Sequence, residues 1–329
     1  MTAGGGRERI VNAGLAALLL AVPLWAHWAG EPFTITLATR AAILALAGVG
    51  LNLALGTGGL VSLGHAAFFG LGGYAMGILA YHAQTVTPLP LWDLAGTRSM
   101  PVIWLVAVVG GAAVAALVGA LSLRSSGVYF IMLTLAFGQM CFYFAVAWPA
   151  YGGEDGLSIW VRNGFPGLNT LDPLQFFLLV YAVLVAVIWM MARITASPFG
   201  LALAAARQSP ARVEAVGGRP FRLRLVAFVI SGAVTALAGA LFADLNRFVS
   251  PSMLNWQTSG ELIVIVVLGG VARLFGPVAG AIVLVALEHW LGGISDYWQI
   301  ALGVALLAVV LFARGGLVGA LAGRPVAHD

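Results

Sequence analysis

The run GTGGLVSLGHAAFFGLGGYAMG, residues 56–77, lies between long apolar stretches and contains the densest cluster of glycines in the chain. Each glycine inside a helix costs about 0.5–1 kcal/mol relative to alanine. A bilayer tolerates irregular or closely packed backbone only where protein or an aqueous cavity covers it. The cluster therefore predicts a segment at the centre of a helical bundle, among the least lipid-exposed parts of the protein.

The composition is that of an all-α, polytopic integral membrane protein. Hydrophobic residues make up 61% of the 329 residues and charged residues 9%, whereas a soluble domain has about 25% charged residues. The single cysteine, Cys141, excludes an intrachain disulfide and a cysteine-cluster metal site. We therefore expect one transmembrane domain over residues 1–329, a bundle with glycine-rich broken or closely packed helices.

Apolar runs of about 20 residues, the length that crosses a bilayer, predict about ten transmembrane segments. They lie at residues 10–29, 33–55, 60–82, 101–122, 127–148, 174–192, 223–245, 258–271, 274–291 and 297–313. The eighth is short, so 258–291 forms either two spans or one broken helix. The first follows basic residues, and we expect a retained span rather than a cleaved signal peptide.

The arginines orient these spans. There is no lysine, so all 16 basic residues are arginine. With the N-terminus in the cytoplasm and ten crossings, twelve arginines fall on the inner side and three on the outer side, which is a strong positive-inside bias. Arg273 lies inside only if 258–271 crosses the membrane. The sequence thus predicts cytoplasmic N- and C-termini and a long inner loop at 193–222.

The inner loop 193–222 is predicted to form one or two short helices outside the membrane. Ser197-Pro198 and Ser209-Pro210 are typical helix starts, and Gly217-Gly218 is a typical helix end. The apolar face is expected to hold Leu201, Ala204 and Ala205, with Arg207 and Glu214 on the other face. From the residues alone, such a helix either lies on the membrane surface or docks on a cytoplasmic partner.

Few ionisable groups lie within the spans. Asp244, Glu261 and Glu288 fall near outer span ends, and each is a candidate for a structural or a functional role. Asp244 is expected to pair with Arg247 at i+3, and Arg40 is expected to extend outward to solvent.

Two further patterns predict contacts between helices. His65 is expected to make one helix–helix hydrogen bond. Gly232, Ala236 and Ala240 recur at four-residue spacing, which predicts a close helix crossing. The sequence contains no Ser/His/Asp grouping, nucleotide loop or HExxH motif, and these absences argue against an enzyme.

Several stretches together resemble one known family. They are LNLALGTGGLVSLGHAAFFGLGGYAMGIL (51–79), SSGVYFIMLTLAFGQMCFYF (125–144) followed by YGGEDGLS (151–158), SPFGLALAAARQSPARVEAVGG (197–218), LVAFVISGAVTALAGALFADLNRFVSP (225–251) and TSGELIVIVVLGGVARLFGPVAGAIVLVALE (258–288). In this order and spacing, they are similar to the LivM-like permease subunits of bacterial ABC importers for branched-chain amino acids. The similarity covers almost the whole chain.

The resemblance implies a permease subunit that is not an enzyme and has no ATPase site of its own. Its partners would be a second, homologous permease, two cytoplasmic ABC ATPases and an extracytoplasmic substrate-binding protein, within the lipid of a bacterial inner membrane. No cofactor and no nucleic acid would bind to this chain, because the ATPases use the ATP. The cargo would be a branched-chain amino acid or a related small polar solute, such as urea or a short amide.

The resemblance also assigns residues. The coupling loop would lie at 197–218, and the residues expected to couple to the ATPases are Gly200, Arg207, Arg212, Glu214, Ala215 and Gly217. The residues expected along the translocation path are Gly56, Gly59, Ser62, Gly64, His65, Phe69, Tyr74, Thr134, Gln139, Gly269 and Gly270. Ala272 stands where the family commonly has another glycine, a departure that bears on the flexibility of the turn 269–277.

Two other classes of protein are weighed against this one. An autonomous ion-coupled secondary transporter would carry its substrate without an ATPase and would show internal inverted repeats. An integral membrane enzyme would need a cluster of polar residues, which the sequence does not show.

Overall fold

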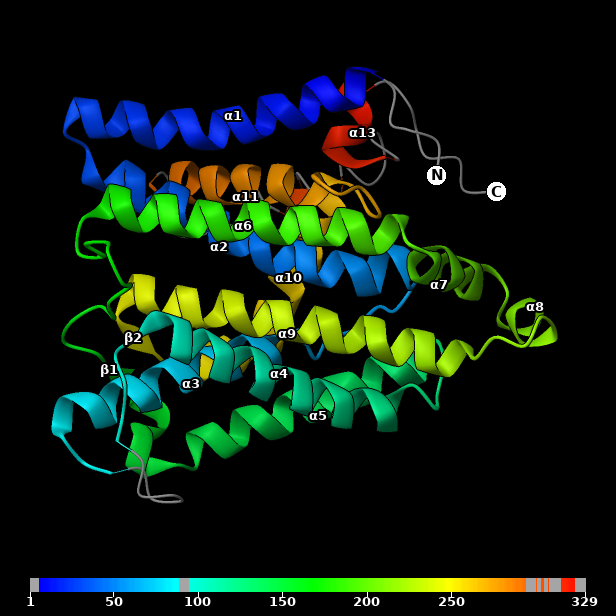
Figure 1. Ribbon diagram of the computed structural model, residues 1–329, viewed down its shortest axis with the longest axis horizontal. Helices are drawn as coiled ribbons and strands as arrows, with labels where there is room; N and C mark the ends of the chain where they lie inside the picture. The colour runs from blue at the N-terminus through cyan, green and yellow to red at the C-terminus, as the bar shows by residue number, and fades with distance from the viewer. Residues whose placement is uncertain are drawn as a thin grey trace.

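The computed structural model describes residues 6–88, 95–293 and 315–322, together with residues 300, 303, 304 and 307. The predicted tenth span, 297–313, lies almost wholly outside these residues. Helices occur at each of the nine remaining predicted spans, so the all-α fold is confirmed (Figure 1). The long helices are α1 (Gly6–Ala29), α2 (Pro32–Asn52), α3 (His65–Thr85), α4 (Met100–Ser122), α5 (Val128–Val146), α6 (Pro173–Ala196) and α9 (Pro220–Asn246).

Shorter elements complete the described part of the chain. They are the π-helix η1 (Leu53–Thr57), the 3-10 helices η2 (Pro149–Tyr151), η3 (Gly153–Asp155) and η4 (Pro251–Leu254), the strands β1 (Leu157–Ser158) and β2 (Phe248–Val249), and the helices α7 (Pro198–Gln208), α8 (Pro210–Ala215), α10 (Trp256–Gly269), α11 (Gly276–Gly292) and α13 (Gly316–Ala322). Within the described residues, six helices are long and apolar enough to cross a membrane, and α10 and α11 are shorter apolar helices. The chain is thus a multi-pass membrane protein.

The third helix begins later than predicted. α2 continues into η1, where Gly58 N donates to Leu53 O at 3.0 Å, and α3 starts at His65 rather than at residue 60. Gly59 has a φ of 68°, a left-handed conformation that glycine adopts without steric cost. Residues 58–64 therefore form an irregular link between α2 and α3.

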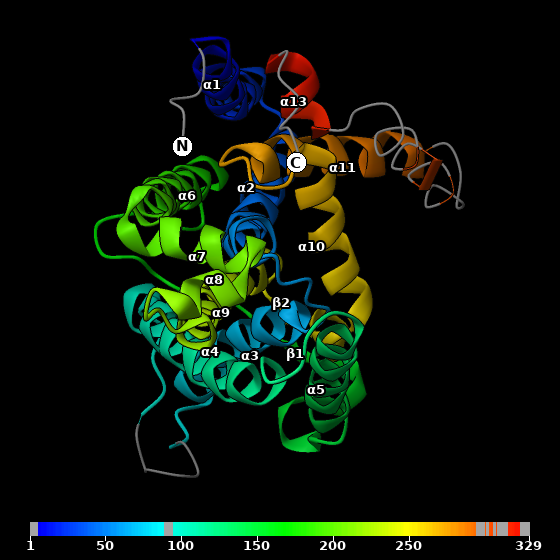
Figure 2. The same cartoon turned by 90° about the vertical axis from the view of Figure 1, so that its right-hand side faces the viewer.

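The segment 258–291 forms two helices rather than a single broken one. α10 has 14 residues, or about 21 Å, which is less than the thickness of about 30 Å of the hydrocarbon core. Figure 2 shows α10 steeply inclined to the helices that are seen end-on. α10 packs closely on α11, because a Cβ atom on Gly280 would collide with the carbonyl of Ile265.

α9 lies at the centre of the bundle and contacts α2, α3 and α4 (Figure 2). A Cβ atom on Gly72 of α3 would collide with the carbonyl of Ala236, and one on Gly239 would collide with the carbonyl of Phe69. The backbones of α3 and α9 therefore touch. This confirms the crossing that the small residues of the seventh span predict.

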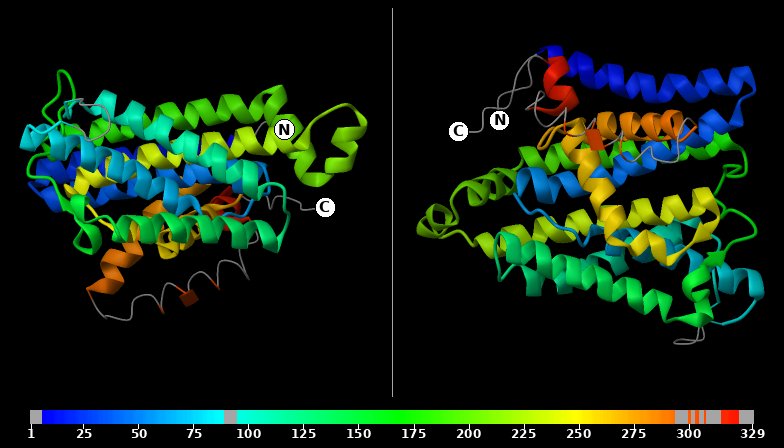
Figure 3. Two further views of the ribbon diagram at one scale, coloured as in Figure 1. Left: turned by 90° about the horizontal axis from the view of Figure 1, so that it is seen from below. Right: turned by 180° about the vertical axis from the view of Figure 1, so that it is seen from behind.

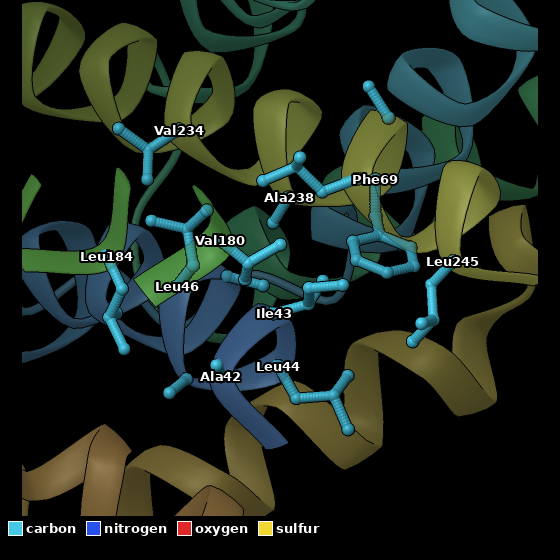
Figure 4. Packing of buried hydrophobic residues seen from close by; sticks show 14 of the residues in the cluster. Ala42, Ile43, Leu44, Leu46, Phe69, Val180, Leu184, Val234, Ala238 and Leu245 are labelled. Atoms are coloured by element: carbon cyan, nitrogen blue, oxygen red, sulfur yellow. The ribbon is translucent and has the colours of Figure 1, made fainter. Parts of the chain in front are cut away.

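The largest hydrophobic cluster of the described residues extends through most of the bundle, and Figure 4 shows part of it, between α2, α6 and α9. Ile43 and Leu46 of α2 are fully buried, and they lie beside Val180 and Leu184 of α6 and Val234 of α9. In a bilayer such contacts stabilise the bundle by close packing rather than by removal from water.

The bundle has two distinct ends (Figures 1 and 3). One carries α7, α8, the start of α1 and α13, and we call it the α7–α8 end. The other, the β1–β2 end, carries an antiparallel strand pair with Leu157 opposite Val249. The start of α1 and the loop 193–222 share one end, as the predicted order of spans requires.

The glycine-rich segment 56–77 is buried, as predicted. All residues from Gly64 to Gly70 are buried, and Gly59 and Val61 are its exposed positions. Phe68 is 0% exposed and Phe69 1%. α3 is enclosed by α4, α5, α9 and α10, which explains why this segment needs glycine for close contact.

The ionisable groups find other partners than predicted. Arg40 does not extend freely into solvent: its guanidinium pairs with Glu288 at 2.9 Å, and its side chain is 33% exposed. Asp244 does not pair with Arg247; its Oδ1 accepts a hydrogen bond from Asn163 Nδ2 at 2.8 Å. The reason is that Arg247 caps α9 with a φ of 53°, so the helical i, i+3 geometry ends before it.

The predicted helix–helix hydrogen bond of His65 is confirmed. It runs from Nε2 to Ser231 Oγ of α9 at 2.8 Å.

Candidate functional site

The helices α7 and α8 begin and end as predicted. The hydroxyl oxygens of Ser197 and Ser209 accept hydrogen bonds from the backbone N–H groups of Gly200 and Arg212, each at 3.4 Å. After α8, Gly217 has a φ of 82°, and Gly218 N donates to Val213 O at 2.8 Å. This is the hydrogen-bonding pattern of a Schellman cap.

The face of α7 that packs on the bundle is a different one from the predicted apolar face of Leu201, Ala204 and Ala205. Leu203 and Ala206 are fully buried against the bundle, whereas Leu201 is 51% exposed and Ala205 is exposed. α7 continues beyond the end of α6 after a break at Ser197 (Figure 1), and Gly200 lies close to the end of α6, since a Cβ on it would collide with the carbonyls of Ile194 and Thr195.

Arg207 forms one of the polar links between α7 and the bundle, and Arg224 of α9, which donates to Ala206 O at 2.9 Å, forms another. The guanidinium of Arg207 donates to the carbonyl of Gly56 in η1. A Cβ on Gly59 would lie 2.8 Å from Arg207 Cγ, so Gly59 leaves room for this side chain. The prediction that Arg207 and Glu214 share a face is wrong, because Ser209, with a φ of −152°, separates their two helices.

A second link runs from η1 to the turn 270–275. Asn52, at the end of α2, donates from Nδ2 to Arg273 O at 2.8 Å, and its Oδ1 accepts from Ala272 N at 3.0 Å. Ala272 has a φ of 63°, a conformation that costs about 1–2 kcal/mol outside glycine. A Cβ on Gly56 would lie 2.7 Å from Ala272 N. α7, η1 and this turn are thus in contact; we call Arg207, Gly56, Asn52 and Ala272 the coupling track.

The same turn is tied to the start of the chain. Arg273 is 6% exposed and lies 3.5 Å from the carboxylate of Glu8 in α1. Gly319 of α13 lies beside its guanidinium, since a Cβ there would be 3.7 Å from Nη2. The turn therefore joins α1, α13 and the coupling track at the α7–α8 end.

The structure separates the predicted path residues into groups. Gly56 and Gly59 belong to the contact with α7, and Gly269 and Gly270 belong to the turn beside it. Gly64 and His65 begin α3, and a Cβ on Gly64 would lie 2.7 Å from the carbonyl of Thr134.

Most of the remaining path candidates are packed within protein. The hydroxyl of Ser62 accepts from Gly64 N at 3.2 Å, and Ser62, His65 and Thr134 are fully buried. Tyr74 is 5% exposed, and Gln139 is half-buried on α5. Their place along a translocation path stays a prediction.

A cavity of about 430 Å³ lies between α2, α3, α9, η4 and α10, toward the β1–β2 end. Its walls are Arg40, Leu44, Phe69, Phe242, Ser252, Met253, Asn255, Gln257, Thr258 and Glu261. Phe69 is the predicted path residue among them. Glu261 was a candidate for a functional role, but the other polar wall residues were not predicted, although the polar run NWQTSGE at 255–261, just before an apolar segment, was a usable signal.

Arg162 fastens the loop of the β1–β2 end to the end of α9. Its guanidinium donates to the carbonyls of Asp244 at 3.1 Å and Leu245 at 3.2 Å, and it lies 4.3 Å from the centre of the Phe176 ring. Burial lowers the pKa of Arg162, while the charge of Asp244 acts in the opposite direction. A cation at the last carbonyls of a helix is stabilising.

Short helices fastened to one end of a closely packed, glycine-rich bundle and a cavity at membrane depth point to a membrane permease. The chain belongs to the family of branched-chain amino acid transport system permease components, whose family model matches residues 33–324. It is 28% identical, over 328 aligned residues, to the high-affinity branched-chain amino acid transport system permease protein LivM of Escherichia coli (strain K12). That alignment covers 92% of this chain and 74% of the relative. LivM of Salmonella typhimurium (strain LT2) is 27% identical with the same coverage. No solved structure matches the chain.

Proposed function

We propose that this chain is the permease subunit of an ABC importer and forms half of its translocation path. Its cargo is a branched-chain amino acid, because the relatives it resembles are named as permeases for branched-chain amino acids. Its partners are a homologous second permease, two ATPases and a substrate-binding protein. The chain binds no cofactor itself, and the ATPases use the ATP.

The observation that carries this proposal is the construction of the α7–α8 end. α8 projects from the bundle (Figure 1), and Arg212, Glu214, Ala215 and Gly217 are exposed on or beside it. Val216 is 84% exposed. A short projecting helix with apolar and charged groups suits insertion into a groove of a partner. We assign this end to the cytoplasm of a bacterial cell, where the ATPases bind, and the β1–β2 end to the outer face of the inner membrane.

The coupling track gives a route from the ATPases to the bundle. Movement of α7 pulls on the carbonyl of Gly56 through Arg207, and Gly56 lies against Asn52 and Ala272. Asn52 holds the turn that precedes α11. Closure of the ATPases would therefore change the angle of α2 and α11 together and alternate the access of the path between the two membrane faces.

The proposal is tested by uptake into proteoliposomes. We expect leucine uptake when this chain is assembled with the partner subunits and ATP is supplied on the α7–α8 side. The same chain without the ATPases should give no uptake, with or without an ion gradient. Uptake by the chain alone, driven by an ion gradient, would instead establish the rival secondary transporter.

A further inference from the structure

The cavity between α2, α3, α9, η4 and α10 combines charged and apolar walls at membrane depth. Arg40 lies in the ninth position of α2, about 12 Å along the helix from its start. Glu261 lies in the sixth position of α10 and is exposed at the surface of the chain. Because α10 is steeply inclined (Figure 2), the depth is set by Arg40, and an ionisable group at that depth is costly in lipid. The open side of this cavity therefore faces water or another protein rather than lipid.

The charges of the cavity do not balance. The guanidinium of Arg40 pairs with Glu288 of α11 at 2.9 Å, and its side chain is 33% exposed. Glu261 lines the same cavity as Arg40, and it forms no ion pair within the described residues. When ionised, Arg40 carries one positive charge, and Glu288 and Glu261 each carry one negative charge. Because Arg40 pairs with Glu288, Glu261 is the carboxylate without a counter-charge among the described residues.

The rest of the wall divides into two parts. Leu44, Phe69 and Met253 form an apolar floor and are each less than a tenth exposed. Gln257 belongs to the first turn of α10, where the N–H groups of Trp256 and Thr258 already donate to Asn255, so the contribution of this turn to a carboxylate is the side-chain amide of Gln257 and the positive end of the helix dipole. A volume of about 430 Å³ lies within the range of small-molecule sites, roughly 300–1,000 Å³.

We propose that this cavity holds the transported solute inside the permease and that it selects for an α-amino acid with an apolar side chain. Glu261 receives the ammonium group. Arg40 and the first turn of α10 receive the carboxylate, and the apolar floor receives the aliphatic side chain. Urea and short amides carry no cation and would leave Glu261 without a counter-charge. This inference rests on the proposed import function and assigns its cargo a binding site within this chain.

The test is binding of radiolabelled leucine to the purified full-length chain, with its partners where they copurify. We expect saturable binding that 4-methylpentanoate, urea and acetamide do not compete away. Leucinol, which keeps the ammonium group but has no carboxylate, should compete weakly.

The first variant tests the ammonium side of the site. Glu261→Gln removes a charge-assisted contact and should weaken leucine binding by about tenfold or more. Glu154→Gln, an exposed glutamate of η3, is the matched control and should bind as the unaltered chain does.

A second variant tests the carboxylate side without changing the net charge. Arg40→Gln with Glu288→Gln removes the ion pair as a unit, so the preference for leucine over leucinol should fall by about tenfold. The proposal is overturned if Glu261→Gln binds leucine normally, or if urea or acetamide competes as well as leucine. If leucine binding depends on Glu261 but the assembled transporter shows no ATP-driven uptake, the import function is wrong and the site stands. If Glu261→Gln takes up leucine normally, the site is wrong and the import function stands.

Discussion

Asn52 is the residue on which the geometry of the α7–α8 end depends most. It is 8% exposed, and its amide satisfies one backbone donor and one backbone acceptor of the turn 270–275. A buried amide that loses such partners leaves polar groups unpaired, at a cost of about 1–3 kcal/mol each. The left-handed backbone of Ala272 is held in place by this side chain.

Replacing Asn52 should therefore loosen the turn. We expect Asn52→Ala to lower the stability of the purified protein by about 1–3 kcal/mol, measured as a lower midpoint of thermal unfolding in detergent. Ala272→Gly in the same background should recover part of the loss, because glycine adopts a positive φ freely. Asn246→Ala, at an exposed asparagine at the end of α9, is the control. If Asn52→Ala unfolds at the same temperature as Asn246→Ala, the tethering role is wrong.

Single residues were predictable from the sequence where their partners are close along the chain or follow a helical repeat. The serine caps of α7 and α8 and the glycine end of α8 are local, and they were predicted correctly. Arg207 lies 151 residues from Gly56, and Arg40 lies 248 residues from Glu288. No spacing rule connects residues so far apart, so the partners of these two arginines could not be predicted.

At the scale of helices, the crossing of α4 with α9 can be tested at two adjacent glycines of α4, Gly110 and Gly111, of which Gly111 lies against α9. A Cβ on Gly111 would collide with Ala236, whereas a Cβ on Gly110 would meet nothing within 4 Å. We expect Gly111→Leu to force the two helices apart and to lower the unfolding midpoint and the yield of folded protein. Gly110→Leu should be neutral or should stabilise α4 by about 0.5–1 kcal/mol.

Thermal unfolding and size-exclusion profiles of the two variants side by side decide this point. Equal losses for Gly110→Leu and Gly111→Leu would mean that the substitution disturbs α4 itself rather than its contact with α9. A greater loss for Gly110→Leu would contradict the packing described here.

Helix positions were largely predictable, and helix ends were less so. Apolar runs located the helices up to residue 291, because burial in lipid demands continuous apolar sequence. The start of α3 was placed too early, since hydropathy does not register that residues 60–64 form other hydrogen bonds, from Leu60 N to Ala54 O and from Gly64 N to Ser62 Oγ. The steep inclination of α10 also escaped prediction, because packing against neighbouring helices sets the tilt of a helix.

At the scale of the whole molecule, the two ends of the bundle have different tasks in this account. The α7–α8 end carries exposed docking groups and the coupling track, and the cavity with Arg40 and Glu261 lies toward the other end. α2 and α11 connect them, because Asn52 and Arg40 both lie on α2 and Glu288 lies on α11. A signal received at one end thus reaches the charged wall of the cavity through these two helices.

The most direct test of this account is the ratio of leucine imported to ATP hydrolysed by the assembled transporter carrying Arg207→Ala. We predict that ATP hydrolysis continues while leucine import falls by about tenfold or more, since the contact of a charged donor with Gly56 is lost. Arg222→Ala, at an exposed arginine near the start of α9, should keep the normal ratio. An unchanged ratio for Arg207→Ala, or an equal fall for Arg222→Ala, would contradict the claim that α7 drives the bundle through Arg207 and Gly56.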